Sequence, residues 1–200
     1  MGIDQFRYIK EIKEYAKEHK VPIMQDDGIN FLTNFIIKHQ ITSVLEVGTA
    51  IGYSAIQMVL TSPTVKVTSI ERDHERYLQA LKNIKQLNLE DRITLIFRDA
   101  KEVHLDEKFD LIFLDAAKAQ NIAFFEQFEK NLNPRGFILT DNISFHGLVE
   151  QEESKIESRN VRGLVRKIKN YIQFLKENEH YEVTFYKVGD GIAVARQKEE

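Results

Sequence analysis

Five short apolar runs alternate along the chain with segments of helical periodicity, and this alternation constrains the fold more than any other feature. The runs are TSVLEV (42–47), VKVTSI (65–70), ITLIF (93–97), FDLIFL (109–114) and GFILTD (136–141). Apolar residues recur with helical spacing in 4–19, 74–88, 119–131 and 160–177. Strands that are apolar almost throughout and alternate with helices predict a mostly parallel sheet covered by helices on both faces.

The two ends of the chain add to this pattern. Before the first run, Pro22 ends one helix, and Asp26 or Asp27 is placed to cap a second. After the last long helix, YEVTFY and GIAVA flank the turn KVGD, which is typical of an antiparallel hairpin. We expect one α/β domain over residues 1–200, with N-terminal helices in 1–40, a core in 41–200 and a polar loop at 149–160.

Composition excludes several classes of protein. The 200 residues are 42% hydrophobic, carry a net charge of −3 and contain no cysteine. Disulfides, thiol nucleophiles and cysteine metal sites are therefore excluded, and nucleic-acid binding would need a local basic patch. The charged N-terminus lacks a signal-peptide pattern, and no apolar run approaches the roughly 18 residues of a membrane span. We expect a cytoplasmic protein with no membrane partner.

Ligands of doubly wound sheets bind at the carboxyl ends of the strands, so the strand ends are the first place to look. The first run ends in EVGTAIGYS (46–54), where Gly48 and Gly52 allow a tight turn and close approach by a ligand. Ala50 stands where the dinucleotide fingerprint has glycine, which disfavours NAD but not a nucleoside without phosphates. Glu46 could face a cationic ligand, although a turn with no ligand is the alternative.

The next two strand ends also carry acids. Glu71 is placed as the acid that holds ribose hydroxyls, and Asp99, followed by Ala100, could accept from an exocyclic amine such as that of adenine. The alternative for each is a helix cap, a role that Asp73 can fill after the second strand. Together the three strand ends predict a nucleoside pocket.

Strands four and five end in oxygen-bearing side chains. Asp115 ends strand four, and Asp141 with Asn142 ends strand five. Carboxylate and amide oxygens suit a hard cation such as Mg²⁺. Two separate helix caps would explain the two aspartates but not Asn142. Lys118 follows Asp115 by three residues. A nearby dication would lower the pKa of this lysine and fit it to take a proton from a substrate hydroxyl, although a lone lysine at a helix start is more often a solvated charge.

Taken together, residues 46–54, Asp115-Ala-Ala-Lys118 and Asp141-Asn142 resemble the cation-dependent O-methyltransferases related to catechol and caffeoyl-CoA O-methyltransferases. The resemblance implies a seven-stranded Rossmann-like sheet, S-adenosylmethionine (AdoMet) as methyl donor, and a homodimer. It implies that Glu71 holds the ribose, Asp99-Ala100 contacts adenine, and Asp115, Asp141 and Asn142 bind Mg²⁺ with Lys118 as the base. It further implies cofactor contacts from Met24, Glu46, Gly48, Ser54 and Asp115.

Within that family, DAAKAQ, TDNISFHGLV and IESRNVRGLVRKI are most similar to bacterial tRNA 5-hydroxyuridine methyltransferases, which make 5-methoxyuridine at the wobble position. Plant and animal relatives usually carry tyrosine three places after the lysine, where this chain has Asn121. A basic stretch supports an RNA acceptor, because phosphate contacts need such a patch. It comprises Arg159, Arg162, Arg166, Lys167 and Lys169. A solvated amphipathic helix explains the same residues about as well.

The sequence therefore predicts an AdoMet- and Mg²⁺-dependent O-methyltransferase acting on tRNA 5-hydroxyuridine. The first alternative is the same chemistry on a small catechol-like phenol. A NAD-linked dehydrogenase is disfavoured by Ala50 and by the lack of a proton-relay partner. A non-catalytic AdoMet-binding protein is disfavoured by the metal set and Lys118.

Overall fold

The computed structural model describes residues 3–116 and 118–198, with only the backbone of Ile3, Lys118 and Glu153. It divides into two compact parts, one ending at His104 and the other beginning at Leu105, and each is described by itself below. The expected single domain over 1–200 stays a prediction. Within the described residues, no helix is long and apolar enough to cross a membrane.

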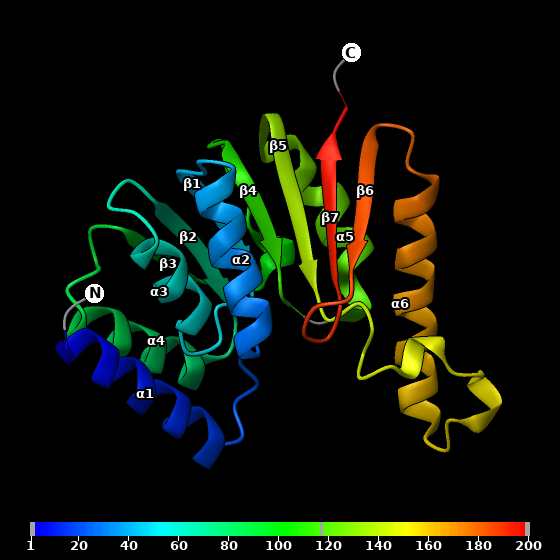
Figure 1. The fold of residues 1–200 in the computed structure, drawn as a ribbon, viewed down its shortest axis with the longest axis horizontal. Coiled ribbons are helices and arrows are strands. Elements are labelled where there is room, and N and C mark those ends of the chain that lie inside the picture. Colours follow the sequence, from blue (N-terminus) through cyan, green and yellow to red (C-terminus); the bar gives the residue numbers. More distant parts are fainter. Residues whose placement is uncertain (1–2, 117, 199–200) are drawn as a thin grey trace. The chain divides into compact units, whose positions relative to one another are not determined.

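The described residues of the first part form three parallel strands, four α-helices and one 3-10 helix. Its elements are α1 (Ile3–Glu18), α2 (Asp26–Lys38), β1 (Ser43–Val47), α3 (Tyr53–Leu60), β2 (Lys66–Glu71), α4 (His74–Gln86), β3 (Ile93–Phe97) and the 3-10 helix η1 (Ala100–Glu102) (Figure 1). β1 pairs with β2 and β2 with β3, both in parallel. Four of the five residues of β1 are buried, which explains its apolar sequence.

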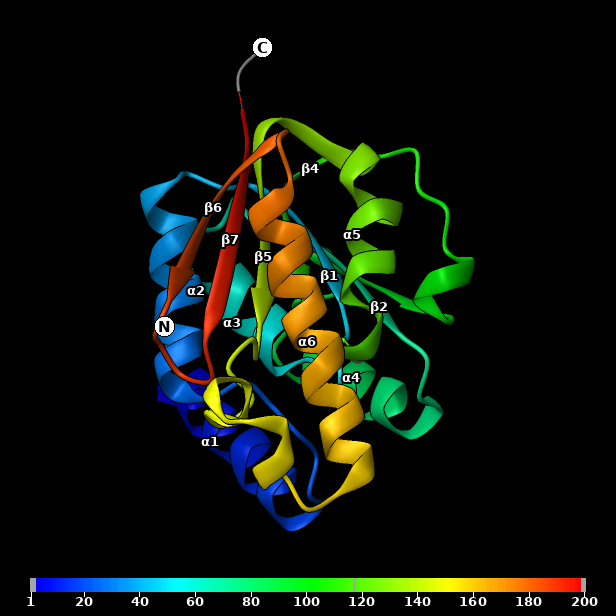
Figure 2. The same ribbon diagram turned by 90° about the vertical axis from the view of Figure 1, so that its right-hand side faces the viewer.

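The second part contains the remaining strands and the longest helix. Its elements are β4 (Phe109–Leu114), η2 (Lys118–Gln120), α5 (Asn121–Phe128), η3 (Glu129–Asn131), β5 (Leu132–Asp141), η4 (Leu148–Glu150), η5 (Glu153–Lys155), α6 (Arg159–Glu177), β6 (Tyr181–Tyr186) and β7 (Ile192–Gln197). β4 and β5 are parallel, whereas β7 runs antiparallel to both β5 and β6. α5 and α6 lie next to each other (Figure 2), where the rings of Phe125 and Phe174 meet at 5.3 Å.

The predicted fold class is confirmed. The strands belong to a seven-stranded sheet, in the order β3-β2-β1 in the first part and β4-β5-β7-β6 in the second. The parallel strands are the five apolar runs of the sequence, and the antiparallel hairpin is the one expected around 187–190.

Some local expectations were wrong. Neither Asp26 nor Asp27 caps α2: Gln25 occupies the cap position without a side-chain bond, and the Asp26 carboxylate instead accepts from Lys13 Nζ at 2.6 and 2.7 Å. The segment 119–131 is helical as expected, with an α-helix between two 3-10 turns. β5 begins four residues earlier than expected, because Leu132 already pairs with Phe109 of β4. The NPRG turn lies where the register of this pairing shifts, and Arg135 within it is left-handed (φ 65°).

Candidate active site

The turn between β1 and α3 has the tight, left-handed backbone that a close ligand contact requires. Gly48, Ala50 and Gly52 have φ of 105°, 48° and 83°. The carbonyl of Ile70, on the neighbouring strand, accepts from Gly48 N at 3.0 Å and from Thr49 N at 3.1 Å. Glycine is needed at two of these positions for conformational reasons, whereas Ala50 pays the steric cost of its Cβ. These two hydrogen bonds hold the start of the turn against β2.

Glu71 stabilises this turn from the end of β2. Its Oε2 accepts from Ala50 N at 2.7 Å, and its Oε1 accepts from the backbone N–H groups of Arg72 and Asp73 at 2.9 and 2.8 Å. The carboxylate is therefore rigidly placed at the strand end, where the sequence predicts that it holds a ribose. Oε1 accepts two of these bonds and Oε2 only one, so Oε2 keeps a lone pair for a hydroxyl donor.

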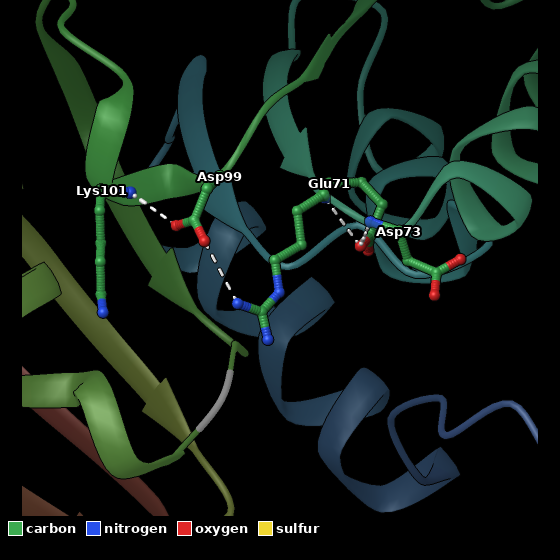
Figure 3. A network of polar contacts seen from close by, with 5 residues as sticks. Glu71, Asp73, Asp99 and Lys101 are labelled. Atoms are coloured by element: carbon green, nitrogen blue, oxygen red, sulfur yellow. Dashed lines mark hydrogen bonds and ion pairs between the residues drawn. The ribbon is translucent and has the colours of Figure 1, made fainter.

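Asp99 follows β3 and lies near Glu71 (Figure 3), and Ala100 after it begins η1. Asp99 accepts from Lys101 N at 3.1 Å and from the Arg72 guanidinium at 3.2 Å. The Lys101 N–H, and to a smaller degree Arg72, lower the pKa of Asp99, so the carboxyl stays ionised. Asp99 caps η1, as the alternative explanation held, and Asp73 caps α4 by accepting from Arg76 N at 3.0 Å. Capping does not exclude an adenine contact, which stays a prediction.

Glu46 lies deeper than a ligand-facing acid would. Its side chain is fully buried, and the hydroxyls of Ser54 and Ser69 donate to its two oxygens. Thr49 Oγ1 lies 2.5 Å from Ser69 Oγ and extends the chain of hydrogen bonds. Burial raises the pKa of Glu46 to about 7, against the opposing effect of the two serines. In this structure Glu46 acts on the turn through Ser54 and Thr49, and its direct contact with a cofactor stays a prediction.

Met24 is the remaining predicted cofactor residue of the first part. It is buried just before α2 and packs against the backbone of Gly28, since a Cβ added there would lie 2.9 Å from Met24 Cε. Gly48, Ser54, Glu71 and Glu46 are thus brought together around one turn, whereas Met24 is held separately by α2.

In the second part, the structure brings the predicted metal residues together. Leu114 and Thr140 are paired across β4 and β5, so Asp115, which follows β4, and Asp141, the last residue of β5, come side by side. Asn142 Nδ2 donates to Asp141 Oδ2 at 2.8 Å and lies 3.5 Å from Asp115 Oδ1. Asn142 has φ 62°, a left-handed conformation that asparagine tolerates better than most residues.

This donor set fits a hard dication. Two carboxylates held this close repel each other unless a positive group or dipole lies between them, as the amide N–H of Asn142 does here. Rotation of the amide would present its oxygen instead, giving three oxygen ligands of the kind Mg²⁺ prefers. No group of three or more His, Cys, Asp or Glu side chains is placed to hold a metal within the described residues, and this set has only two such members.

Lys118, the predicted base, begins η2 three residues after Asp115. Its side chain, like the whole of Ala117, lies outside the described residues. Its role as a base therefore stays a prediction from sequence.

Two buried polar residues were not predicted. Asp190, in the turn before β7, accepts from the backbone N–H of His146, and its Oδ2 lies 3.5 Å from His146 Nδ1. It holds the loop after Asn142, in which Phe145, His146 and Gly147 all have positive φ. Asn83, in α4, donates from Nδ2 to Ile51 O at 2.8 Å, inside the β1–α3 turn. The sequence did not predict these contacts, because Asp190 stands in the polar turn KVGD and Asn83 is a single asparagine within a helix.

The basic stretch forms the first half of α6, but its members differ. Arg159, Arg166 and Lys167 are exposed. Arg162 instead donates from Nη1 to the carbonyls of Ile156 and Glu157 at 2.5 and 3.0 Å, and so holds the preceding loop. Lys169 Nζ donates to Gln151 O at 3.2 Å. The predicted RNA contact of Arg162 therefore competes with a structural role.

Comparison with known proteins identifies the family that this chain matches. The family model described as O-methyltransferase matches residues 2–198. The crystal structure of a candidate caffeoyl-CoA O-methyltransferase from Staphylococcus aureus is 34% identical, covers 95% of this chain and 92% of its own, and superposes with a TM-score of 0.90. An O-methyltransferase from Bacillus cereus in complex with S-adenosylhomocysteine (AdoHcy) is 25% identical, covers 96% and 91%, and has a TM-score of 0.82. The caffeoyl-CoA O-methyltransferase of Stellaria longipes is 26% identical over 95% of this chain and 83% of its own.

Proposed function

Because the chain belongs to the O-methyltransferase family and is an AdoMet-dependent O-methyltransferase of the caffeoyl-CoA type, we propose that its acceptor is the 5-hydroxyl group of tRNA wobble 5-hydroxyuridine, with Mg²⁺ as a second cofactor. The product is 5-methoxyuridine. The observation that carries the RNA acceptor is the exposed cationic half of α6, Arg159, Arg166 and Lys167, on a chain of net charge −3. Phosphate contacts supply most of the sequence-independent affinity for nucleic acid.

The donor side uses the rigid turn of the first part. Glu71 is held by three backbone N–H groups and offers the remaining lone pair of Oε2 to a ribose hydroxyl. Gly48 and Ser54 serve the methionine end, and Asp99 with Ala100 contacts adenine. AdoMet, when bound there, supplies an electrophilic methyl group on a sulfonium sulfur. Fixing the donor in one orientation removes much of the entropic cost of a bimolecular encounter.

The acceptor side uses the residues at the ends of β4 and β5. Asp115, Asp141 and Asn142 would hold Mg²⁺ through their oxygens, as their converging arrangement allows. Mg²⁺, when bound, would lower the pKa of the acceptor hydroxyl. Lys118 then takes the hydroxyl proton on its ε-amine, and the acceptor oxygen attacks the methyl carbon as the bond to sulfur breaks.

A small phenolic acceptor is the second candidate, and the names of the caffeoyl-CoA relatives favour it. A catechol and a 5-hydroxyuracil each place two oxygens on adjacent carbons, so both suit the same metal set. The two candidates differ in size and charge, because only tRNA carries phosphates that reach beyond the site.

The experiment that separates the two candidates combines tRNA and catechol assays on one set of variants. Nucleoside mass spectrometry should detect 5-methoxyuridine when the protein is incubated with AdoMet, Mg²⁺ and tRNA that contains 5-hydroxyuridine. Arg166→Ala with Lys167→Ala should raise KM for this tRNA and flatten its salt dependence, since fewer counterions are released on binding. Neither change should affect methylation of catechol.

Lys176→Ala is the matched control, because Lys176 lies in the last turn of the same helix. Arg162→Ala is unsuitable, since Arg162 holds the loop before α6. Efficient turnover of catechol, with no methyl transfer to the tRNA, would refute the RNA acceptor and leave the phenolic one.

A further inference from the structure

Asn83 is a buried amide that no part of the proposed chemistry uses. Asn83 lies in α4 and is only 1% exposed. The nitrogen and the oxygen of its side-chain amide contact different segments of the chain. Nδ2 donates to Ile51 O at 2.8 Å, while Oδ1 accepts from Tyr8 OH at 3.1 Å and from Gln79 Nε2 at 3.0 Å. One side chain therefore joins α1, α4 and the β1–α3 turn.

The contact with Ile51 completes the anchoring of the turn. The first residues of the turn donate to Ile70 O, and Ala50 N donates to Glu71. Ile51 is 1% exposed, so without Asn83 its carbonyl would be a buried acceptor with no solvent to replace the amide. Such a carbonyl would favour a different backbone conformation. That would move the Gly52 N–H of the same peptide, which donates to Thr49 O at 2.9 Å, and with it the turn that carries the proposed cofactor contacts.

The contact with Tyr8 links α1 directly to α4. α1 buries Ile9, Ile12 and Ala16 along its length. Tyr8 lines an open pocket of about 270 Å³ together with Leu87 and Asn88 at the end of α4. Beside this pocket, the Tyr8–Asn83 hydrogen bond connects the two helices.

We propose that Asn83 is a positioning residue for AdoMet, and that through Tyr8 it couples the N-terminal helix α1 to occupancy of the β1–α3 turn. Coupling of this kind is reciprocal. A cofactor that fixes the turn orders Asn83 and with it α1, and a change in α1 that frees Asn83 weakens the cofactor. The proposal concerns the donor site alone and holds for either acceptor.

Three substitutions separate the two halves of the proposal. Asn83→Ala removes all three hydrogen bonds. Asn83→Asp keeps an oxygen for Tyr8 and Gln79 but cannot donate to Ile51 O, so only the turn is released. Tyr8→Phe keeps the turn contact and releases only α1. Arg7→Ala is the control, because Arg7 precedes Tyr8 on α1 while its guanidinium is exposed and pairs with Asp4 rather than with Asn83.

Calorimetry with AdoHcy, well below the unfolding temperature, is the first measurement. Loss of a buried hydrogen bond that leaves its partner unsatisfied predicts a rise in Kd of about 10-fold for both Asn83 variants. Tyr8→Phe should raise Kd by about 3-fold, as expected for an indirect contact, and Arg7→Ala should leave it unchanged. Hydrogen exchange should show that AdoHcy slows exchange in residues 3–18 of the wild type but not in Tyr8→Phe.

A purely structural Asn83 gives a different result. Its variants would then unfold more easily yet bind AdoHcy with the wild-type Kd, and this outcome overturns the positioning role. Should Asn83→Ala not fold, Asn83→Asp and Tyr8→Phe carry the test alone. If Tyr8→Phe matches the wild type in both Kd and exchange, α1 is not coupled to the turn and that half of the proposal is wrong.

Discussion

Replacing Glu46 by glutamine tests the buried hydrogen-bond network of the donor site. Glu46 is fully buried, and burial raises its pKa from the ordinary value of 4.5 to about 7. Between these two values the folded protein binds a proton that the unfolded chain does not bind. Stability is therefore greatest below pH 4.5 and falls as pH rises to about 7, after which this contribution stays constant.

The size of the effect follows from the pKa change. At about 1.4 kcal/mol for each tenfold change in proton binding, the wild type should lose about 3 kcal/mol between pH 4.5 and 8 from this group. Glutamine has nearly the same shape and does not titrate. Its carbonyl accepts from one serine, and its amide donates to the other, whose hydroxyl then turns toward another acceptor such as Thr49.

Urea unfolding of both proteins without AdoMet, at several pH values from 4.5 to 8.5, measures this difference. The free energy of unfolding of Glu46→Gln minus that of the wild type should rise by about 3 kcal/mol over the range, because contributions from other groups cancel. Glu90→Gln is the control, since Glu90 is exposed in the same part of the chain. A constant difference for Glu46→Gln across all pH values would refute the link between burial and protonation.

Three further substitutions have expected outcomes. Asp141→Ala should abolish methyl transfer yet leave the calorimetric Kd for AdoHcy within about twofold, because the metal set binds acceptor rather than donor; EDTA should act in the same way and Mg²⁺ should reverse it. Lys118→Ala should lower kcat by about 10²–10⁴-fold with a smaller change in KM, as loss of a general base does in steady-state assays. Asp190→Ala leaves the His146 N–H without its acceptor and should lower the urea-derived free energy of unfolding by about 1–3 kcal/mol.

Much of the fold could be predicted from sequence because it depends on local patterns. Each apolar run that became β1 to β5 carries its own burial signal, and the hairpin of β6 and β7 carries its own turn. Asp73 caps α4 with a bond to a residue three positions away. The cap of α2 was predicted wrongly, because the Asp26 carboxylate pairs with Lys13 on another helix. Local sequence patterns do not show contacts between helices.

The candidate site divides in the same way. Chain order placed acids at the ends of successive strands, and parallel pairing of β4 with β5 then brought Asp115 beside Asp141. Sequence could not tell that Arg162 holds a loop while Arg166 and Lys167 stay exposed, because helical periodicity places all three outside the apolar stripe.

The sequence by itself determined which residue types stand at the strand ends, because the period and length of the apolar runs place those ends. Only the tertiary structure decided how those residues are held. Tyr8 and Asn83 are 75 positions apart, Asn83 and Ile51 are 32 apart, and His146 and Asp190 are 44 apart. Hydrogen bonds of this kind depend on distances of about 3 Å between segments that chain order does not fix, so they form only once the core has packed.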